Sequence, residues 1–249
     1  MSHRTIVQWN QWLDNGLGQL TQRSEQQLLE NFLNGTYGKH AVLIGLPRQI
    51  ELIKALDLPC HLLLTSLPDH QKRDINTIES NLHELPIASG SVDLVILPHI
   101  LELVDNPRQL LSEACRIVKP EGHLIICGFN LYSLWGLTKV LRPKNEFMPK
   151  HHYLHQGTLK KWLHLSDFEL VKQSQILYRP PVQNAGVLNK LQFMEWLGNQ
   201  CHLPWGAIYV LMAQAKVLPL TPIRLRWKQR IPAVSVPTSI PGPTARNSN

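Results

Sequence analysis

His99 stands where this 249-residue chain could move a proton. It follows the apolar run Val92–Leu97 and Pro98. An imidazole with its ordinary pKa of about 6.5 can accept a proton from a hydroxyl or an amine at neutral pH. Glu102 lies three residues further on, at a spacing that brings two side chains together in a helix. We predict that His99 is a catalytic base oriented by Glu102; the alternative is that His99 only begins the following helix.

A second group of histidines carries a weaker signal. His151, His152 and His155 follow Lys144 and Lys150 in a basic segment. Their spacing is loosely compatible with zinc, but no cysteine or carboxylate lies beside them. The four cysteines of the chain are scattered without a CxxC pair. We therefore expect no metal site and interpret this segment as a positively charged lid.

The elements that would position these residues alternate between strands and helices. Apolar runs bounded by turn signals predict strands, at residues 41–45, 60–65, 76–82, 92–97, 123–128, 167–177 and 207–213. Helical spacing and start signals predict helices, from Ser24, over 49–56, from the Asp105-Asn106-Pro107 turn and over 158–165. Strand and helix in alternation predict an α/β protein with a doubly wound, mostly parallel sheet.

Residues 82–130 also carry an ordered, gap-free set of motifs. These are Leu85-Pro86-Ile87, Ser91-Val92-Asp93-Leu94-Val95, Asp105-Asn106-Pro107 and Glu113-Ala114-Cys115-Arg116-Ile117-Val118-Lys119-Pro120-Glu121-Gly122. The set resembles the second half of a class I S-adenosylmethionine-dependent methyltransferase domain of the type-11 kind. The resemblance implies a seven-stranded sheet with an antiparallel edge hairpin, S-adenosylmethionine as cofactor, and methyl transfer.

The resemblance places the cofactor at the carboxyl ends of the strands. It implies cofactor-binding positions at Gly45, Leu46, Pro47, Thr65, Asn81, Leu82, Leu97 and Pro98. The chain departs from the family pattern in its first-strand loop, where Leu43 replaces the acid and where Pro47 and Gln49 replace two glycines. Thr65 replaces the acid that binds the ribose, and Asn81 the Asp that meets the adenine. Two functions therefore stay open: methyl transfer to an unidentified acceptor, and a catalytically inactive binding or regulatory module.

A second resemblance covers nearly the whole chain. The run Gly128-Phe129-Asn130 and the end Pro243-Thr244-Ala245-Arg246-Asn247 are similar to an uncharacterised bacterial subgroup of type-11-like proteins. The weak first-strand loop recurs in that subgroup. Tyr132 and Trp135, which follow the fifth expected strand, either cover a substrate or pack in the core.

Charge divides the chain into unequal parts. The net charge is +7, and no acidic residue follows Glu195. The basic residues beyond it are Lys216, Arg224, Arg226, Lys228, Arg230 and Arg246. We predict a helical N-terminal extension (1–38), a methyltransferase-like domain (39–218, with an insertion at about 180–205) and a basic, Pro-rich, largely disordered tail (219–249) that could meet nucleic acid or an acidic partner. Without an 18-residue apolar run or a signal-peptide pattern, we expect a cytoplasmic protein with no membrane span.

Overall fold

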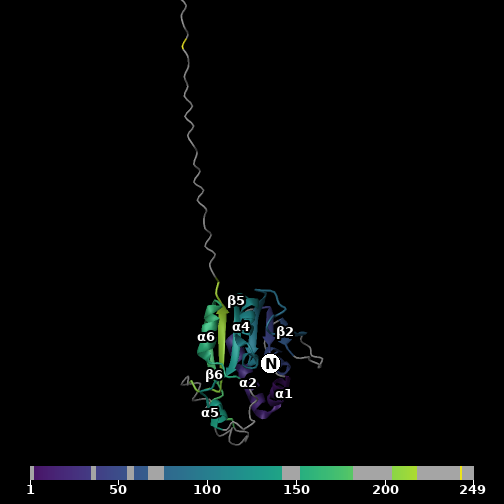
Figure 1. The fold of residues 1–249 in the computed structure, drawn as a ribbon, viewed down its shortest axis with the longest axis vertical. Helices are drawn as coiled ribbons and strands as arrows, with labels where there is room; N and C mark the ends of the chain where they lie inside the picture. The colour runs from purple at the N-terminus through teal and green to yellow at the C-terminus, as the bar shows by residue number, and fades with distance from the viewer. Residues whose placement is uncertain are drawn as a thin grey trace, which may run out of the picture. The chain divides into compact units, whose positions relative to one another are not determined.

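The computed structural model describes residues 3–34, 38–54, 59–66, 76–141, 152–181, 204–217 and 242. The chain divides into two units, residues 1–217 and 218–249, and all the helices and strands named below belong to the first (Figure 1). Most of the basic segment 142–155, most of the insertion at 180–205 and almost the whole tail lie outside the described residues.

Seven strands form one sheet. They are β1 (His40–Ile44), β2 (Cys60–Thr65), β3 (Asn76–Glu79), β4 (Val92–Pro98), β5 (Val118–Phe129), β6 (Phe168–Ile176) and β7 (Ile208–Ala215). Their order across the sheet is β3-β2-β1-β4-β5-β7-β6. Strands β1 to β5 are parallel, whereas β7 runs antiparallel to both of its neighbours. The predicted doubly wound α/β sheet with its antiparallel edge hairpin is confirmed.

The helical elements connect and cover these strands (Figure 1). They are α1 (His3–Asp14), α2 (Gly16–Leu33), the 3-10 turn η1 (Pro47–Ile50), α3 (Glu51–Lys54), the 3-10 turn η2 (Ile100–Glu102), α4 (Pro107–Ile117), α5 (Leu134–Leu141) and α6 (Gln156–Leu165). The helix expected over 49–56 is instead a 3-10 turn followed by a single α-helical turn. Among the helices described, none has both the length and the hydropathy to cross a bilayer.

The second N-terminal helix begins at Gly16, earlier than the Ser24 start that we predicted. Two glycines precede Ser24, and glycine weakens a helix. Gly18 nevertheless lies in α2 because α1 approaches it closely. A Cβ atom at residue 18 would collide with the carbonyl oxygen of Trp12. Tertiary packing therefore selects a residue that helix propensity disfavours.

The motif residues of the strand–helix–strand unit are bonded to one another. Glu113 accepts a hydrogen bond from the backbone N–H of Leu85 (3.0 Å) and forms an ion pair with Arg116 (2.8 Å). Arg116 also donates to the carbonyl oxygens of Leu85 (3.1 Å) and Ile87 (3.0 Å). Helix α4 begins as predicted, with Asn106 as its N-cap and Pro107 in its first turn. The Glu-x-x-Arg pair thus fastens the turn before β4 to the helix after it.

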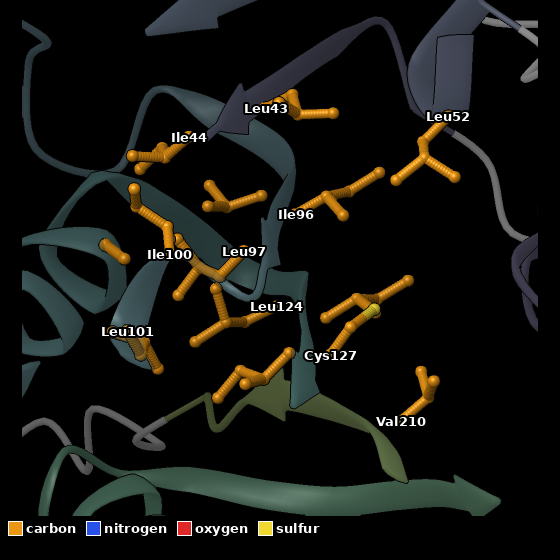
Figure 2. Close-up of a cluster of buried hydrophobic side chains, with 14 of the residues drawn as sticks. Leu43, Ile44, Leu52, Ile96, Leu97, Ile100, Leu101, Leu124, Cys127 and Val210 are labelled. Carbon is orange, nitrogen blue, oxygen red and sulfur yellow. The ribbon is translucent and has the colours of Figure 1, made fainter. Parts of the chain in front are cut away.

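The core gathers apolar side chains from elements far apart in the sequence. Figure 2 shows Leu43 of β1, Ile96 of β4, Leu124 of β5 and Val210 of β7 in one cluster. These four side chains are fully buried. Because parallel strands are covered on both faces, their sequences are nearly continuous apolar runs. That property is what made β1 and β4 visible in the sequence.

Helices α1 and α2 join this core. Trp9 and Leu29 are fully buried. In the N-terminal half of α2, the Gln22 amide donates to the carbonyl oxygen of Arg48 (2.9 Å), which follows β1. At its other end, Lys172 of β6 donates to the carbonyl oxygen of Phe32 (2.7 Å). Helix α2 therefore reaches from the loop after β1 to the edge strand β6.

Candidate functional site

The carboxyl ends of β1, β2 and β4 meet at one edge of the sheet. Ile44 is level with Leu64, and Leu43 with Ile96, in the two parallel ladders. The residues that follow these positions therefore come together: Gly45, Leu46 and Pro47 after β1, Thr65 at the end of β2, and Leu97 and Pro98 at the end of β4. Asn81 and Leu82 follow β3 at the same edge, where the N–H of Ser80 donates to Thr65 (3.0 Å). All eight predicted cofactor positions thus lie at this edge.

The space beside Gly45 is filled by a residue that the sequence analysis noted only as a departure. Gln49 is 1% exposed. Its amide oxygen accepts from the N–H of Leu46 (2.9 Å), and its amide nitrogen donates to the carbonyl oxygen of Pro98 (3.1 Å). A Cβ atom on Gly45 would lie 2.7 Å from that amide oxygen. The Gln49 side chain therefore bridges β1 and β4 at the place where the family pattern has glycine.

Thr65 and Asn81 carry the polar groups at the other end of the edge. Thr65 is 1% exposed. Asn81 is exposed, and its side-chain oxygen accepts from the N–H of His83 (3.0 Å). A carbonyl oxygen has two lone pairs, so Asn81 can accept a second hydrogen bond. Both side chains are chemically suited to a nucleoside, although neither is an acid.

His99 leaves β4 in a strained backbone conformation. Its φ angle is 55°, in the left-handed region that residues with a side chain seldom adopt. Its N–H donates to the carbonyl oxygen of Cys127 (2.9 Å) at the end of β5. Such conformations cost about 1–3 kcal/mol and occur where the surroundings hold a side chain in place. In this backbone conformation the His99 imidazole is buried in the protein interior.

The imidazole lies between two carboxylates. His99 Nε2 is 2.6 Å from Glu25 Oε1 of α2, and Nδ1 is 3.3 Å from Glu102 Oε2 of η2. All three side chains are 1% exposed. The other oxygen of Glu102 accepts from the N–H of Phe129 (2.7 Å). The predicted contact between Glu102 and His99 is therefore present, within a buried triad that the N-terminal helices complete.

The triad holds its histidine in the charged form. Burial by itself lowers the pKa of an imidazole, but the negative charges of Glu25 and Glu102 outweigh this effect and raise the pKa of His99 to about 9. At neutral pH both ring nitrogens then carry protons and donate to the carboxylates. An imidazolium has no lone pair to accept a proton. While Glu25 is in place, His99 is an ionic anchor for α2.

Aromatic rings enclose the anchor. The ring of Phe129 stacks on the imidazole at a centroid distance of 4.2 Å, and that of Trp9 lies at 5.8 Å. An aromatic face stabilises a cation most strongly where water is excluded. The sequence analysis missed Glu25 and Trp9 as parts of the site. A signal existed for Glu25, because Thr21, Glu25 and Leu29 share the buried face of α2 and a carboxylate there needs a partner.

The two aromatic residues after β5 behave differently. Trp135 is 2% exposed, and its indole N–H donates to the carbonyl oxygen of Arg179 (2.8 Å), so it packs in the core. Tyr132 is 69% exposed and meets His155 edge to face. His155 itself accepts from the N–H of Gly157 (3.1 Å) and caps α6. Within the described residues no three potential metal ligands form a group, and His151 lies outside them.

Comparison with known proteins agrees with the fold. A family model described as a methyltransferase domain matches residues 37–126. An uncharacterised protein of Escherichia coli K12, YafS, is 28% identical over 224 residues, which are 88% of this chain and 85% of that protein. This relative supports a shared architecture over nearly the whole chain.

Two solved structures share the fold at low identity. An S-adenosylmethionine-dependent methyltransferase of Thermotoga maritima, described as a possible histamine N-methyltransferase, superposes with a TM-score of 0.63 at 20% identity, over 86% of this chain and 97% of that one. The [4+2]-cyclase SpnF superposes with a TM-score of 0.53 at 14% identity, over 81% of this chain and 84% of that one. Together with the sheet order, these findings show that the chain has the class I methyltransferase fold, and residues 37–126 match the methyltransferase domain model.

Proposed function

We propose that the protein is an S-adenosylmethionine-dependent methyltransferase acting on an acceptor still to be identified. The observation that carries the proposal is the meeting of Gly45, Thr65 and Pro98 at the carboxyl edge of the sheet. In open α/β sheets this edge is where ligands bind. The matched methyltransferase family supports the same reading.

The residues at this edge fit the cofactor in two parts. Thr65 would offer a hydroxyl to the ribose, and Asn81 would offer an amide oxygen to the adenine amine. The N–H of Leu46 and the carbonyl oxygen of Pro98 would hold the amino-acid end, once the Gln49 amide that now bonds them has turned away. When bound, S-adenosylmethionine supplies a methyl group activated by its sulfonium. The protein's own part is to align the acceptor in line with that group, which requires little acid–base help.

The predicted role of His99 depends on α2. With Glu25 bonded to Nε2, the imidazole has no site for a substrate proton. Withdrawal of the Glu25 carboxylate would free that nitrogen and lower the pKa of His99 towards neutrality. His99 could then act as a base for an acceptor that must lose a proton.

A catalytically inactive binding or regulatory module is the second candidate. Three observations favour it: Gln49 fills the space beside Gly45, Leu43 replaces the acid, and His99 is locked between carboxylates. The fold itself does not decide between the two functions. The discriminating quantity is the affinity for the cofactor.

Calorimetric titration with S-adenosylmethionine and its demethylated product tests both candidates. We expect binding by the wild-type protein and about tenfold tighter binding by Gln49→Ala, because the variant no longer has to break two buried hydrogen bonds. Gln11→Ala, which removes an exposed glutamine from α1, is the control and should match the wild type. Absence of binding in both the wild type and Gln49→Ala would favour the inactive module.

A further inference from the structure

A cavity of about 780 Å³ lies between α2, α6 and the end of β6. Ile176 and Phe129 both pair with Ile208, so this end of β6 is level with the end of β5. The cavity therefore opens at the carboxyl edge of the sheet. Helix α2 serves two sites there: Glu25 points to the triad, and the stripe Ser24, Gln27, Leu28 and Asn31 lines the cavity.

The described lining of the cavity includes basic side chains. Lys160 of α6 and Arg179 line it, and none of the described residues that line it is acidic. The Lys160 ammonium donates to the amide oxygen of Gln173 (2.6 Å), which is neutral. On α2, Glu25 is bonded to His99, and Glu30 lies outside the lining and accepts from Gln26 (3.2 Å). A cavity of this composition favours an anion over a cation.

The rest of the lining suits an organic molecule with several polar groups. Amide side chains come from α2, α6 and β6, namely Gln27, Asn31, Gln156, Gln173 and Gln175. Phe32, Ile176 and Leu177 supply an apolar wall. Small-molecule sites are typically 300–1,000 Å³ in volume, with an apolar lining and a few polar groups that fix orientation. The cavity has that size, but most of its lining residues are polar, which favours a ligand with several polar groups.

We infer that this cavity binds a small organic molecule bearing a carboxylate or phosphate, with Lys160 as the residue that holds the anionic group. A charge-assisted hydrogen bond from an ammonium to an anion is shorter and stronger than one to a neutral amide. The anion would therefore replace Gln173 as the acceptor of Lys160. Anion binding in this cavity does not depend on methyl transfer. We also infer that the anionic ligand is the methyl acceptor, and this second inference rests on the proposed function.

The test compares a charged probe with its neutral counterpart. Benzoate and benzyl alcohol have one ring and differ in the carboxylate, and inorganic phosphate tests a tetrahedral anion. We expect benzoate to bind the full-length protein at least about tenfold more tightly than benzyl alcohol in low-salt titration calorimetry. Lys160→Gln should reduce benzoate affinity by about tenfold or more. Lys161→Gln is the matched control, because Lys161 is the exposed neighbour on α6 and does not line the cavity.

A second variant tests the preference of the cavity for anions without changing Lys160. Gln27→Glu places a carboxylate in the wall and should weaken benzoate binding while leaving benzyl alcohol unaffected. Equal affinity for the two probes would overturn the inference, as would equal losses in Lys160→Gln and Lys161→Gln, or no binding of benzoate and phosphate at millimolar concentration. Cofactor titration of Lys160→Gln separates the two proposals, since unchanged cofactor affinity with lost anion binding concerns this cavity alone.

Discussion

At the scale of single residues, the site depends on three buried polar side chains: Glu25, His99 and Gln49. Each is about 1% exposed and bonded to a partner from a distant part of the chain. A buried charge without a partner costs several kcal/mol, so such groups occur as satisfied sets. Substitution of any of these residues should therefore change the free energy of unfolding as well as the chemistry of the site.

The triad makes stability depend on pH in a defined direction. The pKa of His99 is raised to about 9 in the folded protein, against about 6.5 in the unfolded chain. Its contribution, on the order of 3 kcal/mol, is fully present below about pH 6.5 and is lost as pH rises through about 9. Urea unfolding of the wild type between pH 6 and 10 should show this loss.

Glu25→Gln supplies the comparison. It removes the carboxylate nearest the imidazole, so the pKa of His99 falls and the loss of stability moves to lower pH. Glu30→Gln, an exposed change on the same helix, should retain the wild-type profile. Identical pH profiles for Glu25→Gln and the wild type would contradict the ion triad.

Thr65→Asp tests the ribose end of the cofactor site. Thr65 is 1% exposed, so a carboxylate there should lower the free energy of unfolding by about 1–3 kcal/mol. Its hydrogen bonds to ribose hydroxyls should tighten S-adenosylmethionine binding by about tenfold. Titration calorimetry and urea unfolding measure the two effects. Weaker cofactor binding than that of the wild type would place the ribose elsewhere.

At the scale of elements, α1 and α2 depend on close contact at one glycine. A Cβ at residue 18 would meet the backbone of Trp12, whereas nothing lies within 4 Å of one at residue 16. Gly18→Ala should therefore lower the free energy of unfolding by about 1–3 kcal/mol despite the better helix propensity of alanine. Gly16→Ala should raise it slightly, by up to about 1 kcal/mol.

Thermal unfolding of the two glycine variants checks this pair. Because the same substitution is made twice within one turn of α2, propensity alone would shift both melting temperatures upward. Stabilisation in both variants would mean that α1 does not pack on α2 as described. Loss of stability in Gly18→Ala should also weaken the Glu25–His99 anchor, which holds the same helix.

At the scale of the whole molecule, the second unit, residues 218–249, is basic. It contains five basic residues and no acid. We propose that this unit recruits nucleic acid. The full-length protein should bind single-stranded RNA, and a plot of log binding constant against log salt concentration should be no steeper than about −3.5. This limit follows from about −0.7 for each phosphate neutralised by one of the five basic residues. Fluorescence anisotropy at several salt concentrations measures it.

Truncation after Val217 is the matching variant. It should abolish RNA binding and leave cofactor affinity unchanged. A full-length protein with Arg224, Arg226, Lys228 and Arg230 changed to Gln keeps the length of the tail and removes most of its charge. Equal RNA binding by the full-length and truncated proteins would show that the tail is not a nucleic-acid site.

The sequence by itself determined the sheet, because that information is local. Side-chain patterns within a few turns predict the apolar runs of β1, β2, β4 and β5 and the capped start of α4. The positions Gly45, Thr65 and Pro98 came from the resemblance to the methyltransferase family, which places the cofactor at the carboxyl ends of the strands. The 3-10 turn at Pro47–Ile50 was missed because 3-10 turns often begin α-helices, and residue spacing over so few positions does not separate the two.

Only the tertiary structure decided what the polar residues do. Glu25 and His99 are 74 residues apart, and Gln49 and Pro98 are 49 apart. No periodicity or motif links positions at such separations, because the first pairing depends on where α2 packs and the second on the pairing of β1 with β4. The packing of α2 converts an apparent base into a buried cation, and it places Lys160 across from α2 in a cavity whose described lining residues include no acid. The sequence gives the types of these residues, but their burial and neighbouring charges arise from packing and determine their chemistry.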